Sequence, residues 1–429
     1  MVDQPIEEPW LSAAAAAQML GVQTRSLYAY VSRGLVRSVA AARGRLRLYA
    51  REDLERLRLR RDARAGHGAV AAGALQFGDA VLDSSITELG EDGPRYRGYL
   101  AVELAERGVP FENVAELLWT GVLCDGPVRW LAPKPGGAGR SRPTDSVIDA
   151  LMEETLALAR TDDARSDGRG DALARCGRTL IPQLALASNP AATRADRARA
   201  ARCASIAGMV AEVWRLPGKA VLALDAALIL LADHELNAST FAARVAASTG
   251  ADPYAVVMAA LAALSGPRHG TAALEVVQLL RDTGGPTQAA AVASELRGRH
   301  RLPPGFGHRA YRGVDPRAPP LLALAERLGG TRSAVRAALS LRDVVGRAGS
   351  HPNVDLGLAA LAAAVGAPGA AVTAWFAVAR CAGWLAHAAE QRAAGTLLRP
   401  RARYQGPALR PVEYLDEARP ARRRPRRRH

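Results

Sequence analysis

Three short blocks of this sequence place histidine and aspartate side chains beside glycine and proline, where catalytic loops are expected. The blocks are Ser265–Gly270, Pro304–Arg309 and His351–Asp355. Glycines adjoin His269 and His308, so both imidazoles are predicted to lie on loops that backbone and ligand can approach closely. A lone histidine is more often a core or surface residue than a catalyst. Two imidazoles together with the carboxylate of Asp355 can act as an acid–base set, and the combination indicates an enzyme.

The elements that carry these blocks are predicted to be helices. Aromatic residues make up only 5% of the chain, and few runs of β-branched residues alternate with polar ones. Helices are expected from Ser146 to about Pro411, after a loop rich in glycine and proline over residues 131–145. The uncharged residues 356–379 are long enough to cross a bilayer. Because Gly366–Gly369 interrupts them with a proline, we expect a turn between two buried helices and no membrane span.

Residues 1–65 are predicted to form a separate helix-turn-helix unit. Ser12 can cap a helix over residues 13–20, and Gly21 permits the sharp turn that follows. Thr24 can cap the second helix. Apolar residues at helical spacing on both helices can close a small core between them.

The second helix of such a unit enters the major groove of DNA. A basic hairpin over residues 43–49 and a basic helix over residues 51–60 follow it. The segment resembles the winged helices of the MerR and excisionase type. The resemblance implies DNA contacts from Gln23, Thr24, Arg25 and Tyr28. The alternative is a small helical domain that binds another protein.

The composition indicates a globular, basic protein of a reducing compartment. Its 429 residues carry a net charge of +15, which suggests an anionic partner. Residues 1–64 contribute +5, and residues 418–429, an arginine-rich tail expected to be disordered, contribute +7.

Four cysteines without CxxC spacing argue against a disulfide scaffold and a zinc site, so no metal is expected. The N-terminus lacks the order of a secretory signal, so a cytoplasmic location is expected.

Seven motifs between about residues 70 and 412 resemble the citrate synthase family. In chain order they read LDSSITELGEDGPRYRGYLAVELAE, ADHELNAST, GPRHG, PGFGHRAY with DPRA, PNVD, FAVARCAGWLAHAAEQ and RPRARYQGP. The resemblance implies a mainly α fold with two helical domains. The large domain would comprise residues 66–270 and 366–417, the small domain residues 271–365, and the winged helix-turn-helix would precede both.

The resemblance also implies the reaction, a condensation of acetyl-CoA with oxaloacetate followed by thioester hydrolysis to citrate and CoA. Asp355 is then the base for the acetyl methyl proton, and His269 hydrogen-bonds the developing enolate oxygen. His308 polarises and protonates the oxaloacetate carbonyl. Ser239 is the residue expected to contact the other ring nitrogen of His269.

Substrate contacts are implied by motif position as well. Carboxylates call for forked guanidinium groups, and the family positions for oxaloacetate are held by His234, Arg317, Arg380 and Arg399. Arg399 would come from the partner subunit, which implies a homodimer. The family positions for CoA are held by Arg312, Pro304, Gly305, Phe306, Gly307 and Asn353. The acyl-CoA is a co-substrate, and no permanently bound cofactor is implied.

Two segments beside the catalytic residues depart from the family pattern. Leu356–Ala359 replaces an aromatic-Ser-Gly sequence after Asp355, and Thr271–Leu274 replaces small-Ala-Asn after Gly270. A wider acyl pocket would favour propionyl-CoA, which gives 2-methylcitrate.

Beside citrate synthase and 2-methylcitrate synthase, a third hypothesis is a DNA-binding regulator that uses a synthase-like domain as a metabolite sensor.

Overall fold

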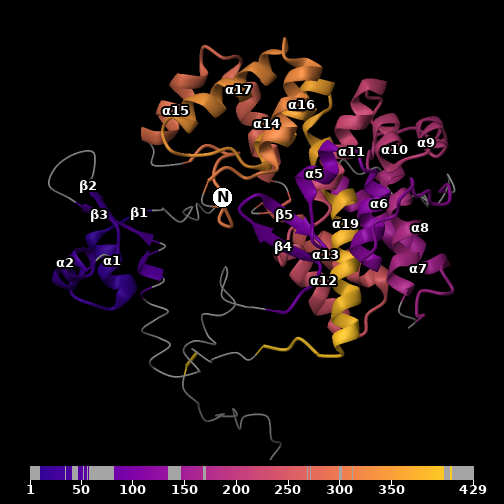
Figure 1. Cartoon of the computed structure of the whole chain (residues 1–429), viewed down its shortest axis with the longest axis horizontal. Coiled ribbons are helices and arrows are strands. Elements are labelled where there is room, and N and C mark those ends of the chain that lie inside the picture. Colours follow the sequence, from indigo (N-terminus) through magenta and orange to yellow (C-terminus); the bar gives the residue numbers. More distant parts are fainter. Residues whose placement is uncertain are drawn as a thin grey trace, which may run out of the picture. The chain divides into compact units, whose positions relative to one another are not determined.

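The computed structural model describes residues 10–33, 35–40, 47–51, 53–55, 57, 82–133, 146–167, 171–267, 269–270, 272–298, 302–311, 313–400 and 406–407. They divide into two compact units, an N-terminal unit within Pro9–Val81 and a main unit within Leu82–Leu398 (Figure 1). Each unit has a hydrophobic core of its own.

The N-terminal unit combines a helix-turn-helix with a small antiparallel sheet. Its elements are β1 (Trp10–Ser12), α1 (Ala13–Leu20), α2 (Thr24–Ser32), β2 (Ser38–Ala40) and β3 (Arg47–Ala50), with strand order β1-β3-β2. As predicted, Ser12 Oγ accepts the Ala15 N–H at 3.3 Å, and Gly21 ends α1 with φ 59°. Leu27 of α2 is fully buried in the core of the unit.

The predicted cap of the second helix is wrong. Helix α2 already includes Thr24, and Gln23 occupies the N-cap position without a side-chain capping bond. Strands β2 and β3 pair antiparallel, which is compatible with a wing, but residues 41–46, which include much of the hairpin predicted over residues 43–49, lie outside the described residues. The described residues between 51 and 57 are helical, in agreement with the predicted third helix.

The main unit is helical apart from one small sheet. Its strands β4 (Thr87–Gly90), β5 (Gly93–Tyr96) and β6 (Tyr99–Leu100) pair antiparallel in that order. Its helices are α5 (Ala101–Glu106), α6 (Phe111–Thr120), α7 (Val147–Thr161), α8 (Ala172–Ala187), α9 (Arg194–Ala200), α10 (Ile206–Val213), η1 (Gly218–Ala220), α11 (Val221–Leu231), α12 (Ala238–Ser248), α13 (Pro253–Leu264), α14 (Ala272–Thr283), α15 (Ala289–Gly298), α16 (Ala318–Gly329), α17 (Ser333–Gly346), α18 (Val354–Val365) and α19 (Gly369–Ala394). The three strands were not predicted, because they are two to four residues long and contain glycine and proline.

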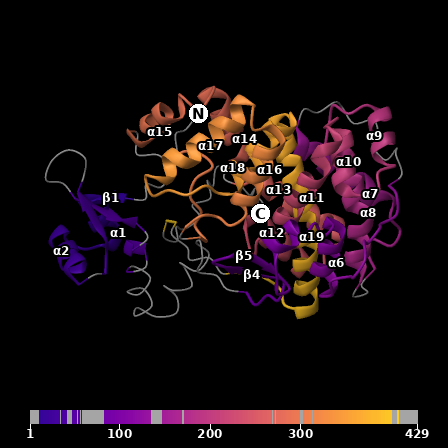
Figure 2. The same cartoon turned by 45° about the horizontal axis from the view of Figure 1, so that its top comes forward.

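Helix α19 runs through the middle of the main unit, where Figure 1 shows it in yellow. It packs against α6, α7, α8, α11, α12 and α13. Figure 2 shows α14–α18 gathered on one side of the unit and α7–α10 on the other. Helix α19 is long and apolar enough to cross a membrane, but 83% of its most apolar window is buried inside the fold. As predicted, Gly366 (φ 77°) and Pro368 separate it from α18.

Helices α16 and α18 lie in close contact because small residues face each other. A Cβ atom on Gly329 would lie 2.6 Å from Ala364 Cα, and one on Gly357 would lie 2.8 Å from Leu321 Cβ. Gly357 belongs to the segment after Asp355 that departs from the family pattern. The close packing of α16 accounts for glycine at this position.

Candidate active site

His269 lies at one end of a partly buried hydrogen-bond chain that joins α12 and α19. Its Nε2 lies 2.8 Å from Ser239 Oγ, which donates to Asn237 Oδ1 at 2.8 Å. The indole N–H of Trp384 donates to the same Ser239 oxygen at 3.1 Å. Burial, reinforced by the charge of Arg380, lowers the pKa of His269 to about 4. The imidazole is therefore neutral at pH 7.

His308 is held in a turn that determines which ring nitrogen carries its proton. The backbone N–H of Ala310 donates to His308 Nδ1 at 3.1 Å. Since Nδ1 accepts this bond, the neutral ring carries its proton on Nε2. Burial and then the charge of Arg317 lower the pKa of His308 to about 4. His308 can therefore donate through Nε2 to a carbonyl oxygen.

His234 follows α11 and lies beside His308. The centroids of the two rings are 5.1 Å apart, edge to face, and His234 Nε2 lies 3.0 Å from the Tyr311 hydroxyl. Burial, together with the charges of Arg317 and Arg380, holds the pKa of His234 well below its ordinary value. The structure thus brings two of the predicted histidines together as neutral rings beside cationic groups.

Arg317 is buried, and a carboxylate holds its guanidinium fork. Its Nε and Nη2 donate to Asp315 Oδ1 and Oδ2 at 2.9 and 2.8 Å. Burial would raise the pKa of Asp315, but Arg317 brings it below its ordinary value. Asp315 Oδ2 also accepts the N–H of Val354, the first residue of α18, at 3.0 Å. One carboxylate therefore ties the predicted substrate arginine to the helix that carries Asp355.

Arg380 reaches the same region from the middle of α19. Its Nε donates to the carbonyl of Leu231, at the C-terminus of α11, at 2.6 Å. Its guanidinium carbon lies 4.5 Å from the centre of the Phe376 ring, in cation–π geometry. Burial lowers the pKa of Arg380 to about 10, so the group stays charged at pH 7. A buried cation of this kind can bind a carboxylate.

Asp355 occupies the first turn of α18. Its backbone N–H donates to Asn353 Oδ1, which caps the helix, at 3.0 Å. Burial raises the pKa of Asp355 to about 6, with Asp315 adding to the effect and Arg317 opposing it. A carboxylate with a pKa in this range is a stronger base than ordinary aspartate and still ionised at pH 7.

Asn353 also joins α18 to the glycine loop predicted to bind CoA. Its backbone N–H donates to the Gly305 carbonyl at 2.9 Å, and its Nδ2 donates to the Gly307 carbonyl at 3.0 Å. Both glycines adopt positive φ values, 86° and 79°. In the same loop Phe306 is buried and Pro304 is partly exposed.

The remaining predicted residues lie elsewhere. Arg399 is exposed, four residues beyond Gly395 at the C-cap of α19. Arg312 lies outside the described residues. The four side chains predicted to contact DNA are all exposed: Gln23, Thr24, Arg25 and Tyr28.

Sequence reasoning gave no role to several polar residues around the site, namely Asp233, Asn237, Tyr311, Asp315, Trp384 and His387. Trp384 lies four residues after Arg380 on α19, and this helical spacing was the available signal. Asp233, which directly precedes His234 in the chain, is fully buried and its Oδ2 lies 3.1 Å from Nε2 of the equally buried His387 on α19. Tyr311 and Asp315 stand inside motifs already singled out.

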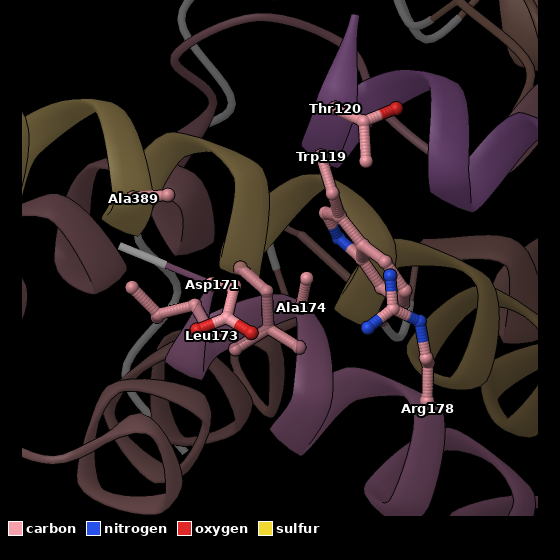
Figure 3. A pocket seen from close by; sticks show the side chains of 8 residues that line it. Trp119, Thr120, Asp171, Leu173, Ala174, Arg178 and Ala389 are labelled. Atoms are coloured by element: carbon pink, nitrogen blue, oxygen red, sulfur yellow. The ribbon is translucent and has the colours of Figure 1, made fainter. Parts of the chain in front are cut away.

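A small hollow elsewhere in the main unit holds none of the predicted residues (Figure 3). It measures about 190 Å³ and is lined by Trp119, Thr120, Asp171, Leu173, Ala174, Arg178, Leu385 and Ala389. Leu385 and Ala389 lie on the opposite face of α19 from Arg380. Its one arginine, Arg178, is already bonded through Nε and Nη2 to the carboxylate of Glu116, at 2.6 and 2.7 Å. Among the described residues, no group of three or more His, Cys, Asp or Glu side chains could hold a metal ion.

Comparisons with known proteins agree with the motif pattern. The family model "Citrate synthase, C-terminal domain" matches residues 136–401, and "MerR HTH family regulatory protein" matches residues 11–69. The chain is 33% identical to "Putative citrate synthase 2" of Mycobacterium tuberculosis over 351 residues, which cover 79% of this chain and 94% of that protein. It is 31% identical to "2-methylcitrate synthase 2" of Corynebacterium glutamicum, covering 75% of this chain and 91% of that one.

The fold recurs in solved structures. One is the citrate synthase of Thermoplasma acidophilum, solved as a ternary complex with carboxymethyl coenzyme A and oxaloacetate. It superposes with a TM-score of 0.68 at 24% identity, over 79% of this chain and 97% of that one. Family model, relatives and fold agree, and the chain belongs to the citrate synthase family of acyltransferases, with a MerR-like helix-turn-helix at its N-terminus.

Proposed function

We propose that this protein condenses acetyl-CoA with oxaloacetate and hydrolyses the resulting thioester, giving citrate and CoA. The observation that carries the proposal is the combination of a partly buried carboxylate of raised pKa with neutral imidazoles beside two buried arginines. Asp355 removes a methyl proton of the acetyl group, and His308 donates its Nε2 proton to the oxaloacetate carbonyl as the new carbon–carbon bond forms. Arg317, through Nη1, and Arg380 hold the oxaloacetate carboxylates, with His234 as a further contact.

The acyl group and the CoA contacts belong to the same proposal. Pro304, Gly305, Phe306, Gly307 and Asn353 would hold CoA, together with Arg312. The relative from Corynebacterium glutamicum is named for 2-methylcitrate, so propionyl-CoA is the second candidate substrate. Comparing kcat/KM for the two acyl-CoA molecules separates these alternatives.

Thiol release tests the reaction. Purified full-length protein is mixed with acetyl-CoA or propionyl-CoA and oxaloacetate, and free CoA is measured. We expect turnover with at least one acyl-CoA, and its loss in His308→Gln and Asp355→Asn. Absence of turnover with both, in a folded protein, would refute the proposal.

Arg399 is proposed to complete the site of a partner subunit in a homodimer. Mixing inactive Arg399→Ala subunits with inactive Asp355→Asn subunits tests this directly. A mixed dimer keeps one intact site, so random exchange should restore about a quarter of wild-type activity. If activity stays at zero after verified subunit exchange, Arg399 does not act across an interface.

DNA binding by the N-terminal unit is the second candidate function. The observation that favours it is helix α2, which contains no acidic residue and exposes Thr24, Arg25 and Tyr28, with Gln23 exposed at its N-cap. Binding to a panel of duplexes over a range of salt concentrations tests it, with and without oxaloacetate and CoA, because a metabolite sensor would couple the ligands. Affinity that is independent of sequence at every salt concentration would contradict sequence-specific recognition.

A further inference from the structure

Asp233 is a buried carboxylate in the short connection between α11 and α12, directly before His234. Its side chain is fully excluded from solvent, and its Oδ2 lies 3.1 Å from Nε2 of His387 on α19. Burial would raise the pKa of Asp233, but His387 and the charge of Arg380 bring it below its ordinary value, so the group is ionised at pH 7. Because an ionised carboxylate only accepts hydrogen bonds, His387 Nε2 is the donor. Helix α19 therefore holds this carboxylate in place.

The same carboxylate oxygen stabilises the turn that carries His234. Asp233 Oδ2 accepts the backbone N–H of Glu235, two residues further on, at 3.1 Å, which is the hydrogen bond of an Asx turn. Glu235 has a φ of 55°, in the left-handed region that disfavours residues other than glycine. The Asp233 side chain thus stabilises a backbone conformation that glutamate alone would avoid.

The backbone of this connection packs tightly against α19. The N–H of Gly383 on α19 donates to the carbonyl of Ala232 at 3.1 Å. A Cβ atom at Gly383 would collide with Asp233 Oδ1 and would lie 2.6 Å from the Ala232 carbonyl oxygen. The N–H of Asp233 itself donates to the hydroxyl of Tyr96 at 3.3 Å. The chain immediately before His234 is therefore fixed by both its backbone and its side chain.

We propose that Asp233, supported by His387, is a positioning residue that orients the substrate histidine His234 through the turn at Glu235. The inference rests on the proposed function, in which His234 contacts oxaloacetate. Without the Asp233 carboxylate, Glu235 is expected to leave its left-handed conformation. His234, whose Nε2 lies 3.0 Å from the hydroxyl of Tyr311, should then lose this contact and its place in the oxaloacetate site.

Equilibrium binding of oxaloacetate to the full-length protein, measured by calorimetry without acyl-CoA, tests the proposal. Asp233→Ala should raise the Kd at least about tenfold, as expected for the loss of one hydrogen bond to a charged group. Asp233→Asn keeps an oxygen that can accept from Glu235 and His387, so its Kd should stay within about threefold of the wild-type value. An unchanged Kd in Asp233→Ala would overturn the proposal. Equal weakening by alanine and asparagine would also overturn it, because the charge and not the turn would then matter.

A second substitution tests the turn itself. Glycine adopts a φ near 55° without strain, so adding Glu235→Gly to Asp233→Ala should restore part of the lost affinity. No recovery in this double variant would contradict a role of the turn. Asp196→Ala is the matched control, because Asp196 is a buried carboxylate that bonds Arg215 and belongs to the capping box of α9. It should lower stability without changing the Kd, and an equal rise in Kd would reduce the effect of Asp233 to a general loss of stability.

The structure of the variant separates this proposal from the proposed function. In a crystal structure of substrate-free Asp233→Ala, Glu235 should have a negative φ, and His234 should no longer bond Tyr311. Retention of both features would overturn the positioning role, whatever the thiol-release assay shows. Absence of turnover in the wild type would refute the proposed function and leave this structural result standing.

A second pair of variants serves if Asp233→Ala does not fold. His387→Ala removes the support of the carboxylate, whereas the terminal amide of His387→Gln can still donate to Asp233. Only the alanine variant should weaken oxaloacetate binding. Equal affinities in the two variants would overturn the proposed support of Asp233 by α19.

Discussion

Replacing Asp355 by asparagine is expected to stabilise the folded protein at neutral pH while removing the base of the proposed reaction. Burial raises the pKa of this carboxyl from 3.8 to about 6. The folded state therefore binds the proton more tightly than the unfolded state, and ionisation destabilises the fold. Because one pH unit corresponds to about 1.4 kcal/mol, the ionised carboxylate costs about 3 kcal/mol. This cost appears as pH rises from about 4 to 6 and is complete above that range.

The assay is thermal unfolding of wild type and Asp355→Asn at a fixed protomer concentration, at pH 8 and at pH 4.5. The variant should have the higher Tm at pH 8, and most of the difference should be lost at pH 4.5. Asp149→Asn is the matched control, since Asp149 is an exposed aspartate in the first turn of α7, and it should change stability by less than about 0.5 kcal/mol. A Tm difference that does not depend on pH, or that favours the wild type at pH 8, would refute the reasoning.

Three further predictions concern the arginine pair, the pH profile and the DNA surface. Asp315→Asn leaves the buried guanidinium of Arg317 without its carboxylate, and it should lower the free energy of unfolding by about 3–5 kcal/mol. Oxaloacetate should then raise the Tm of this variant more than the Tm of the wild type. An equal rise in both proteins would contradict the role of Arg317. Between pH 5 and 8 the rate of thiol release should rise with pH through an apparent pKa of about 6, because Asp355 must lose its proton. His269 and His308 are neutral over this range, since their pKa values are lowered to about 4. A rate that does not change between pH 5 and 8 would exclude Asp355 as the base. Arg25→Ala should weaken DNA binding and, if Arg25 contacts a phosphate, reduce the slope of log K against log salt concentration by about 1. Filter binding at several salt concentrations measures the affinity and the slope. Unchanged binding would exclude Arg25 from the interface.

Local signals were sufficient to predict a helical main unit and the ends of a few helices. The start of α1 at Ala13 and the break between α18 and α19 follow from Ser12 and from Gly366 with Pro368, whose effects reach only a few residues along the chain. Strands β4–β6 were missed because their stability comes from pairing between short segments. The Thr24 cap was placed one residue late, an ordinary uncertainty at a helix end.

The sequence predicted site residues only where they stand in a recognisable motif. His269, His308 and Asp355 stand in recognisable blocks, but the bonds that orient them join distant residues. Asp315 bonds Val354 across 39 positions, and Ser239 bonds Trp384 across 145. A single sequence contains no local pattern for such pairs, so the link between Arg317 and α18 and the contact of Ser239 with Trp384 could be found only from the fold.

Helix α19 carries Phe376, Arg380, Trp384 and His387 toward the site at spacings of three or four residues. Each residue of an α-helix turns the chain by about 100°, so deleting one residue between Phe376 and His387 would rotate everything beyond it away from its partners. This segment can therefore accept exchanges of side chain but no change in length. Insertions that diversify the family are expected in exposed connections such as residues 121–133, and an alignment gap within residues 376–387 would mark a relative that has lost the reaction.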